Sequence, residues 1–366
     1  MQPIRVLQIV TYMGRGGLES MLMNYYRHID RTRVQFDFLV HRDFKADYDE
    51  EIQSLGGKIY HVPRLIPWSR SYRGKLKDFL NAHPEYKIVH VHQDCLSSVA
   101  LQCAKECGVP VRIAHSHNSN QDKNLRFIIK KYYMKQIPEF ATDLLACSKK
   151  AGDWMFCGKA YDVLANAIDL KNYTYNSNIA EGSRNKFGIT NELVVGHVGR
   201  FRKQKNHMFL LDIMTEIVKN VPTAKLLLVG DGDEFPSVKE KAQQLGIEGN
   251  VIFAGNRSDV NEIMQAMDVF VFPSLYEGLP VTMIEAQASE LHCVISDKVP
   301  EECIVTTGLV TVKSLTDSAK DWAEHILKQA KLPRENKICE IKESGYDIST
   351  AAQWLEEFYL NKVEGQ

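Results

Sequence analysis

Residues 193–234 read LVVGHVGRFRKQKNHMFLLDIMTEIVKNVPTAKLLLVGDGDE. Two short apolar runs, 193–198 and 225–229, flank a segment, 207–220, that is long enough for a helix. A strand, a helix and a second strand, with both strands almost wholly apolar, are typical of a parallel βαβ unit covered on both faces. The same alternation continues in both directions along the chain. We therefore expect an α/β fold built on parallel sheets.

The alternation falls into two series, each about the length of one domain. Strands are expected at 4–10, 34–40, 58–62, 88–92 and 111–115, and again at 193–198, 225–229, 250–253, 268–272 and 292–296. Helices are expected at 18–29, 96–107, 207–220, 237–245, 258–266 and 280–290. A polar stretch near 165–185 separates the series. The sequence thus predicts two doubly wound, Rossmann-like domains, 1–170 and 171–348.

The last segment, 349–366, carries large apolar side chains at helical spacing: Trp354, Leu355, Phe358 and Tyr359. We expect it to form a helix that packs on one of the two domains.

Charge and composition exclude several classes of protein. The chain has 366 residues with 45 Lys and Arg against 46 Asp and Glu, which argues against a basic nucleic-acid binder. Residues 1–170 hold 24 basic and 18 acidic side chains, whereas 171–366 hold 21 and 28, so the two halves are expected to face different partners. The eight cysteines have no CxxC spacing, the start shows no signal-peptide pattern, and no apolar run reaches 18 residues. We therefore expect a cytoplasmic location.

Ligands of parallel sheets bind beyond the carboxyl ends of the strands, so polar residues at those ends are the candidates for a site. Gly14-Arg15-Gly16-Gly17 follows the first strand and precedes a helix. Backbone N–H groups in such a loop suit an anion, although a tight turn without a ligand also accounts for the glycines. The spacing is not GxGxxG, which disfavours a dinucleotide site.

Two His-x-His pairs, His90 with His92 and His115 with His117, close two successive strands. Strand alternation puts the members of each pair on the same side. We favour hydrogen bonding to sugar hydroxyls or to an acceptor. A zinc site is a weaker alternative because no carboxylate or cysteine completes it, and purely structural histidines are the third.

Cationic side chains follow the strand at 193–198. Arg200 and Lys205 lie between that strand and a helix N-terminus, where their positive charges suit a phosphate. An ordinary solvated basic loop is the alternative. Further along, Asp231-Gly232-Asp233 forms a DxD string. Its place between a strand and a helix indicates a turn rather than a metal site.

The stretch PSLYEGLPVTMIEA, residues 273–286, is the most specific motif. Glu277 and Glu285 are eight residues apart, and Gly278 and Pro280 mark a loop that enters a helix, since proline is tolerated in the first helical turn. One carboxylate can hold sugar hydroxyls and the other a ribose, while the N–H groups between them face a diphosphate. Glutamates at this spacing are common, and the flanking residues make this instance specific.

The order and spacing of these motifs, from residue 4 to about 290, resemble glycosyltransferase family 4, the retaining enzymes of the GT-B fold. The resemblance is greatest to bacterial enzymes of capsular, exopolysaccharide and lipopolysaccharide synthesis. The residues that carry it are Gly16-Gly17-Leu18-Glu19, the histidine strand ends, Gly199-Arg200 with Lys205-Asn206, Gly230-Asp231-Gly232 and Glu277-x7-Glu285. It implies two domains facing a central cleft and a C-terminal helix that crosses back to the first domain. It also implies a nucleotide-sugar donor, with UDP as the nucleotide that the family suggests, and no metal cofactor.

The resemblance also implies roles for single residues. Arg200 and Lys205 would neutralise the donor diphosphate. Glu277 would contact the transferred sugar, and Glu285 would bind the ribose. The other donor-binding positions would be Gly16, Gly17, Asn256, Arg257, Gly278, Leu279 and Pro280, with Asn256 and Arg257 bordering the base.

A histidine beside the reacting centre is the remaining role that the resemblance implies. His115 and His117 both match it, and His117 is slightly preferred because it lies nearer the end of its strand. The implied chemistry is a front-face displacement with retention, in which the leaving phosphate helps to deprotonate the acceptor.

Two segments account for the positive charge of the first half. RLIPWSRSYRGKLK (64–77) and QDKNLRFIIKKYYMK (121–135) each hold five basic residues among aromatic and aliphatic ones. Such stretches suit an anionic membrane surface, against the alternative of ordinary solvated helices. With the resemblance, they predict a lipid-linked or glycan acceptor and peripheral binding to the inner face of the cell membrane.

Two other functions compete with sugar transfer. A sugar-nucleotide epimerase of the GT-B fold would release a rearranged sugar without any acceptor. A two-lobed ligand-binding protein without enzymatic activity is the second, and Arg200 and Lys205 beside an expected phosphate argue against it.

Overall fold

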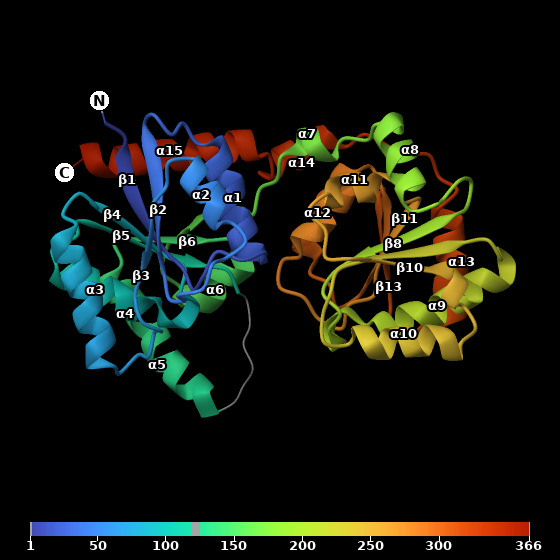
Figure 1. Ribbon diagram of the computed structural model, residues 1–366, viewed down its shortest axis with the longest axis horizontal. Coiled ribbons are helices and arrows are strands. Elements are labelled where there is room, and N and C mark those ends of the chain that lie inside the picture. The colour runs from blue at the N-terminus through green and yellow to red at the C-terminus, as the bar shows by residue number, and fades with distance from the viewer. Residues whose placement is uncertain (1, 119–124, 366) are drawn as a thin grey trace. The chain divides into compact units, whose positions relative to one another are not determined.

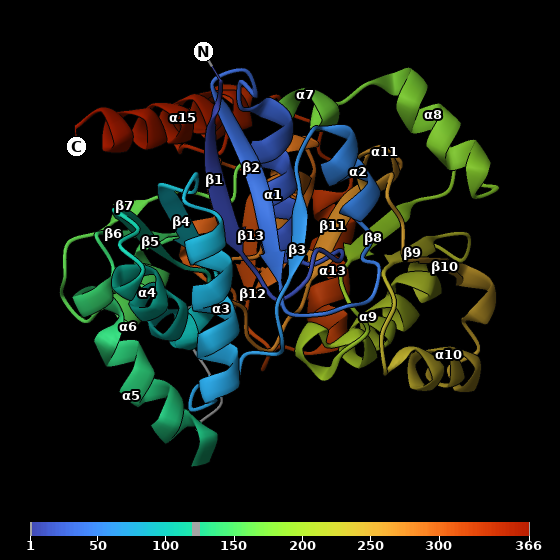
Figure 2. The same cartoon turned by 60° about the vertical axis from the view of Figure 1, so that its left-hand side comes forward.

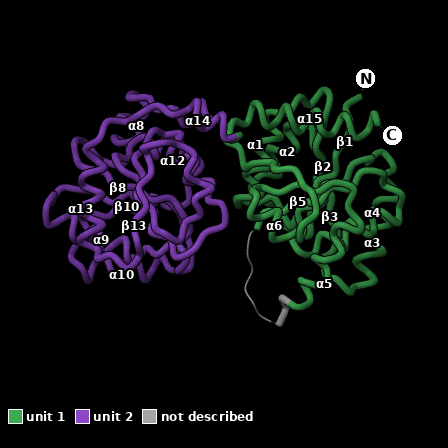
Figure 3. The backbone as a smooth tube through the Cα atoms, turned by 180° about the vertical axis from the view of Figure 1, so that it is seen from behind, with its two compact units in different colours: residues 1–168, 345–366 green, residues 169–344 purple. Residues whose placement is uncertain are grey.

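The computed structural model describes residues 2–118 and 125–365. The chain forms two compact units: unit 1 comprises residues 1–168 and 345–366, and unit 2 comprises 169–344 (Figure 3). Each unit holds one parallel sheet between layers of helices (Figure 1). The predicted fold of two Rossmann-like domains is confirmed, and the C-terminal segment belongs to unit 1.

The sheet of unit 1 has the strand order β3-β2-β1-β4-β5-β6-β7. Its strands are β1 (Ile4–Ile9), β2 (Val34–Val40), β3 (Ile59–His61), β4 (Ile88–Val91), β5 (Val111–Ser116), β6 (Asp143–Ala146) and β7 (Asp162–Val163). The first five match the predicted strands. The last two, of four and two residues, were not predicted.

Helices cover both faces of this sheet (Figures 1 and 2). One face packs against α1 (Gly17–His28), α2 (Asp49–Ser54) and α15 (Ile348–Glu364). The other packs against α3 (Arg70–Ala82), α4 (Ser97–Glu106), α5 (Leu125–Phe140) and α6 (Lys149–Phe156). The predicted C-terminal helix is therefore α15, whose Leu355 and Tyr359 are buried against the sheet, while Trp354 is 39% exposed.

The sheet of unit 2 has the order β10-β9-β8-β11-β12-β13. Its strands are β8 (Val194–Val198), β9 (Lys225–Val229), β10 (Val251–Gly255), β11 (Val269–Phe272), β12 (His292–Ser296) and β13 (Val310–Lys313). On one face lie α9 (His207–Asn220), α10 (Phe235–Gln244) and α13 (Ala319–Gln329). The remaining helices are α7 (Leu170–Tyr173), α8 (Ser177–Lys186), α11 (Val260–Gln265), α12 (Val281–Ala288) and α14 (Ile338–Glu343).

Each sheet contains a point at which the strand order reverses. In unit 1, β1 leads to β2 on one side, whereas its neighbour β4 leads to β5 on the other. In unit 2, β8 leads to β9 and its neighbour β11 leads to β12 in the opposite direction. The loops after such a pair of strands part from each other and leave room for a ligand. Each unit therefore has one preferred site, after β1 and β4 or after β8 and β11.

Candidate functional site

The two loops at the reversal point of unit 2 hold the cationic and acidic residues predicted from the sequence. Nζ of Lys205, after β8, donates a hydrogen bond to Oε1 of Glu277, after β11, at 2.8 Å. The two side chains are only 16% and 6% exposed. The Lys205 ammonium also lies 4.4 Å from the ring centroid of Phe272. A lysine has three donors, so its ammonium can serve both Glu277 and a bound anion.

Two neighbouring residues join these loops. The Gln204 amide donates to the Tyr276 carbonyl at 3.0 Å and to Oε2 of Glu277 at 3.1 Å. Asn206 has a left-handed backbone with φ 58°, which asparagine tolerates, and its amide donates to the Pro273 carbonyl at 3.1 Å. Gln204 was missed by the sequence analysis, since a glutamine in a polar loop carries no signal of its own.

Glu285 lies on α12 and is held by a residue that sequence reasoning missed. The Tyr173 hydroxyl, from α7, donates to Oε1 of Glu285 at 2.7 Å. Burial raises the pKa of Glu285, and the hydrogen bond from Tyr173 opposes that effect. Tyr173 lies 112 residues away in sequence, so only the packing of α7 on α12 brings the two together.

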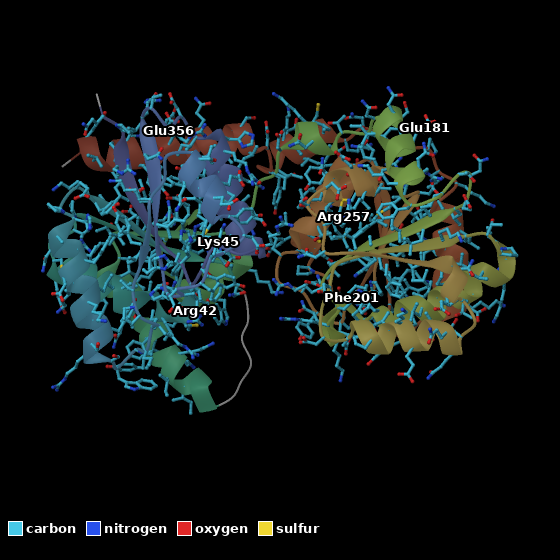
Figure 4. The ribbon with its side chains drawn as sticks, viewed as in Figure 1. Arg42, Lys45, Glu181, Phe201, Arg257 and Glu356 are labelled. Atoms are coloured by element: carbon cyan, nitrogen blue, oxygen red, sulfur yellow. The ribbon has the colours of Figure 1, made fainter. Side chains whose placement is uncertain are left out.

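The other predicted donor-binding residues of unit 2 lie at strand ends. Asn256 and Arg257 follow β10 and are exposed, and the Arg257 guanidinium forms two hydrogen bonds with Asp259, at 2.7 and 2.8 Å (Figure 4). Arg200 follows β8 and is exposed. Gly278, Leu279 and Pro280 lead into α12, whose first turn has no side-chain cap. The Met283 N–H donates to the Pro280 carbonyl at 3.0 Å, and the N–H groups before it suit an anionic ligand.

The DxD string forms a turn, as predicted. Gly230 has φ 141°, and a Cβ atom there would lie 2.1 Å from the Gly199 carbonyl oxygen. The Phe201 N–H donates to the Asp231 carbonyl at 3.0 Å. Glycine thus lets the turn after β9 pack against the loop after β8 and support the backbone beside Lys205.

In unit 1 the four histidines form one buried cluster. His115 is fully buried within β5, whereas His117 follows the strand and is partly exposed. Nε2 of His117 lies 2.8 Å from Nδ1 of His92, and Nε2 of His92 lies 2.9 Å from Oε1 of Gln8. Burial lowers the pKa of both His92 and His117, so these rings are neutral.

These hydrogen bonds determine which nitrogen of His117 carries the proton. The Gln8 oxygen can only accept, so His92 donates from Nε2 and accepts at Nδ1. His117 must then donate from Nε2, which leaves a lone pair on its Nδ1. Within the described residues that atom has no hydrogen-bond partner. Of the two predicted histidines, His117 is thus the partly exposed one, and its Nδ1 itself is buried.

The cluster also bears on the question of a metal. One nitrogen from each of His90, His92 and His115 lies within 4.8 Å of the others, a grouping that can hold a metal ion. Both nitrogens of His92, however, are used in the hydrogen bonds to His117 and Gln8. A metal at this place would have to break one of those bonds.

The glycine loop of unit 1 runs from β1 into α1. Gly16 is the N-cap of α1, and a Cβ atom there would lie 2.2 Å from Oε2 of Glu19. A Cβ on Gly17 would meet nothing within 4 Å. The Glu19 carboxylate is the end of a flexible side chain, so its approach does not by itself require glycine at position 16, and contact of Gly16 and Gly17 with the donor stays a prediction.

Comparisons with known proteins agree with this arrangement. Residues 15–172 match the family model described as Glycosyltransferase Family 4, and residues 180–343 match Glycosyl transferases group 1. The putative glycosyltransferase EpsF of Bacillus subtilis (strain 168) is 37% identical over 364 residues, which cover 94% of this chain and 93% of EpsF.

The chain belongs to the glycosyltransferases.

More distant relatives and solved structures extend the comparison. A Staphylococcus aureus capsular polysaccharide biosynthesis glycosyltransferase, CapH, is 26% identical, with 98% of this chain and 99% of CapH covered. The crystal structure of Anabaena HepE with UDP-glucose has a TM-score of 0.79 at 18% identity and covers 98% of this chain and 99% of HepE. That likeness supports the fold, and this glycosyltransferase therefore has the two-domain architecture predicted from its sequence.

Proposed function

We propose that this glycosyltransferase transfers a sugar, with retention, from a UDP-sugar to a lipid-linked or glycan acceptor in the synthesis of a surface polysaccharide. The observation that carries the proposal is the buried Lys205–Glu277 pair at the reversal point of unit 2. It places an ammonium and a carboxylate side by side, where a donor needs a cation for its diphosphate and an acceptor for its sugar hydroxyls.

In this proposal each polar group acts on one part of the donor. Lys205 and Arg200 bind the diphosphate, with the N–H groups of Gly278 and Leu279. Glu277 accepts hydrogen bonds from the transferred sugar. Glu285, positioned by Tyr173, accepts hydrogen bonds from the ribose, and Asn256 and Arg257 border the base.

The chemistry follows from the charges that develop. Cleavage of the anomeric C–O bond leaves a nucleoside diphosphate anion and an oxocarbenium-like sugar. Preorganised donors aimed at the departing oxygen stabilise that transition state, and one such donor contributes about 3–4 kcal/mol. The leaving phosphate then takes the proton of the attacking hydroxyl. His117 accepts a hydrogen bond from a hydroxyl at the reacting centre once a shift of its neighbours exposes the buried Nδ1, and needs no metal.

The names of a solved structure and of curated relatives support the choice of donor and acceptor. HepE has been crystallised with UDP-glucose. An Escherichia coli relative, 26% identical over 76% of each chain, is a UDP-Gal:alpha-D-GlcNAc-diphosphoundecaprenol alpha-1,3-galactosyltransferase. EpsF and CapH are also named as glycosyltransferases. The epimerase alternative is not favoured.

We also propose that unit 1 binds the inner face of the cell membrane from the cytoplasm. Ile66 and Trp68 are 41% and 67% exposed among the basic residues of 64–77. On α5, Ile128 and Tyr132 are 68% and 61% exposed beside Lys131. Residues 121–124 of the second predicted segment, and the side chains of 125–127, lie outside the described part. No helix in the described ranges has the length and apolar composition to cross a bilayer.

Two experiments test these proposals. A thermal-shift screen of nucleotides and nucleotide sugars should show selective stabilisation by a UDP-sugar, since ligand that binds the native state raises the melting temperature. The shift should vanish in Lys205→Met, and an unchanged shift would sink the site. Co-sedimentation with anionic vesicles should weaken at high salt; equal binding to neutral vesicles would refute charge-driven membrane contact.

A further inference from the structure

Three histidine nitrogens of unit 1 lie close enough together to bind one metal ion. One ring nitrogen from each of His90, His92 and His115 lies within 4.8 Å of the other two. His90 belongs to β4, His92 follows that strand, and His115 belongs to the neighbouring strand β5. Their ring centroids are 4.2–5.3 Å apart. We call these three residues the histidine triad.

The histidine triad is buried, and several of its nitrogens make no hydrogen bond. The three residues are 0–4% exposed. Among the described residues, neither nitrogen of His115 nor Nε2 of His90 has a hydrogen-bond partner. A buried polar atom without a partner lowers stability, so a ligand that engages these nitrogens recovers part of that loss. Burial lowers the pKa of all three rings, which are therefore neutral and have lone pairs for a metal.

Neighbouring residues already orient two of the three rings. Nδ1 of His90 lies 2.7 Å from the hydroxyl of Tyr359 on α15, whose oxygen can accept a hydrogen bond from it. The lone pair of His90 then lies on Nε2, the nitrogen without a partner among the described residues. Oε1 of Gln8 likewise accepts from Nε2 of His92 at 2.9 Å and leaves the lone pair of His92 on Nδ1. Histidines that bind a metal commonly donate from their other nitrogen to such an acceptor, which fixes the ring.

The chemistry of the histidine triad selects the kind of ion. Imidazole nitrogens bind Zn²⁺, Ni²⁺ and Cu²⁺, whereas Mg²⁺ and Ca²⁺ prefer oxygen ligands. Three nitrogens and one water complete the tetrahedron that Zn²⁺ adopts, with Zn–N distances of about 2.0–2.1 Å. Such a site holds its nitrogens about 3.4 Å apart, so the nitrogens of the triad have to approach one another by at most about 1.4 Å. Small rotations of the rings supply that movement.

We propose that the histidine triad binds one divalent transition-metal ion, Zn²⁺ above all, and that this ion inhibits sugar transfer. The lone pair on Nδ1 of His92 accepts a hydrogen bond from Nε2 of His117. A metal bound to that nitrogen takes the lone pair and leaves His117 without its partner. A metal bound to Nε2 of His92 instead moves the His92 proton to Nδ1, which then donates to His117 and shifts the His117 proton to Nδ1. Either way His117 is no longer held in the Nε2–H form that the reaction uses.

The hydrogen bond between His92 and His117 is also the entrance to the site. His117 is partly exposed, whereas Gln8, on the other side of His92, is fully buried. A metal can therefore reach Nδ1 of His92 when His117 turns aside, with no change in the sheet. Metal binding by the histidine triad does not depend on the proposed function, whereas the inhibition rests on the role which that function gives to His117.

The first test measures metal binding by the full chain without a histidine tag. Zn²⁺ followed by calorimetry, and Co²⁺ followed by its visible absorption, should each saturate at one ion per chain. His115→Phe removes a ligand but no hydrogen bond that the described residues make, so it should melt close to the wild type. It should bind Zn²⁺ at least ~100-fold more weakly, since losing even a residue that supports a ligand costs about 10- to 100-fold. His90→Phe is a second variant with the same expected loss of affinity.

The control is a histidine at the surface of unit 2. His325, on α13, is partly exposed beside Asp317, Asp321 and Glu324, where an ion could bind weakly. His325→Gln should change the Zn²⁺ affinity less than about twofold.

The second test measures what the bound ion does. Saturating Zn²⁺ should lower the rate of sugar transfer by the wild type about fivefold or more, because His117 loses the hydrogen bond that fixes its proton. Nitrogen NMR should show His117 leaving the Nε2–H form when Zn²⁺ is added. The rate of His115→Phe with Zn²⁺ is compared with its own rate without Zn²⁺ and should not change, which controls for Zn²⁺ bound to the donor.

Several outcomes would overturn the proposal. Absence of saturable Zn²⁺ binding is one, and equal affinity of His115→Phe and the wild type is another. Loss of binding in His325→Gln would place the ion at the surface of unit 2 instead. Binding that changes neither the rate nor the His117 tautomer would contradict the inhibition. A lack of sugar transfer without Zn²⁺ would contradict the proposed function, whereas one bound ion that is lost in His115→Phe would still support the metal site.

Discussion

Replacing Lys205 by methionine should separate the stability of unit 2 from its chemistry. The substitution leaves Glu277, 6% exposed, with its charge buried and, among the residues that the structure describes, only the Gln204 amide as a side-chain donor. Breaking a buried ion pair costs about 3–5 kcal/mol, and the remaining hydrogen bond favours the lower value, about 3 kcal/mol. Unit 2 has 176 residues, from 169 to 344. For that size about 3 kcal/mol lowers the melting temperature by about 6–12 °C.

The double variant Lys205→Met/Glu277→Gln gives the second half of the test. It removes both charges, so most of the lost stability should return, whereas sugar transfer should stay at least ~100-fold below wild type because the diphosphate has lost its cation. Calorimetry of the ligand-free protein measures the first effect and steady-state kinetics the second.

A matched surface pair provides the control. Lys298 is 53% exposed and lies 3.1 Å from Asp297. Lys298→Met should cost less than about 1 kcal/mol. If Lys205→Met destabilises no more than Lys298→Met, or if the double variant is less stable than the single one, the Lys205–Glu277 pair does not have the role assigned to it.

Further predictions concern Glu285, Tyr173 and the histidine cluster. Burial raises the pKa of Glu285, so the folded chain binds this proton more tightly than the unfolded chain, and stability is lost as the pH rises through the folded pKa. Glu285→Gln should remove that loss, which urea unfolding at a series of acidic pH values measures. The same variant should abolish UDP binding. Tyr173→Phe should weaken UDP binding by up to about tenfold, since it removes one hydrogen bond to Glu285; an unchanged Kd by calorimetry would contradict the positioning role. His92→Phe should lower kcat about fivefold or more, and nitrogen NMR should show His117 no longer restricted to the Nε2–H form; a single unchanged tautomer would refute the control of the His117 tautomer by His92.

The strands and helices could be predicted from the sequence wherever an apolar run was long enough. The segment 193–234 gave β8, α9 and β9 with bounds that differ by at most one residue, because Val194–Val198 and Lys225–Val229 are buried on both faces. The strands β6, β7 and β13 were missed, although the equally short β3, β4 and β11 were predicted. Their assignment comes from pairing with a neighbouring strand, which no local pattern contains.

For the candidate site, the sequence alone determined which residue types follow each strand, and hence that Lys205, Glu277 and Glu285 lie at the carboxyl edge of a sheet. Only the tertiary structure decided their partners. Glu277 pairs with Lys205 because β8 and β11 are neighbours, Glu285 meets Tyr173 because α7 packs on α12, and His117 takes its tautomer from His92 and Gln8. Hydrogen bonds of this kind join residues far apart in the chain, so they depend on strand order and helix packing, which sequence spacing does not specify.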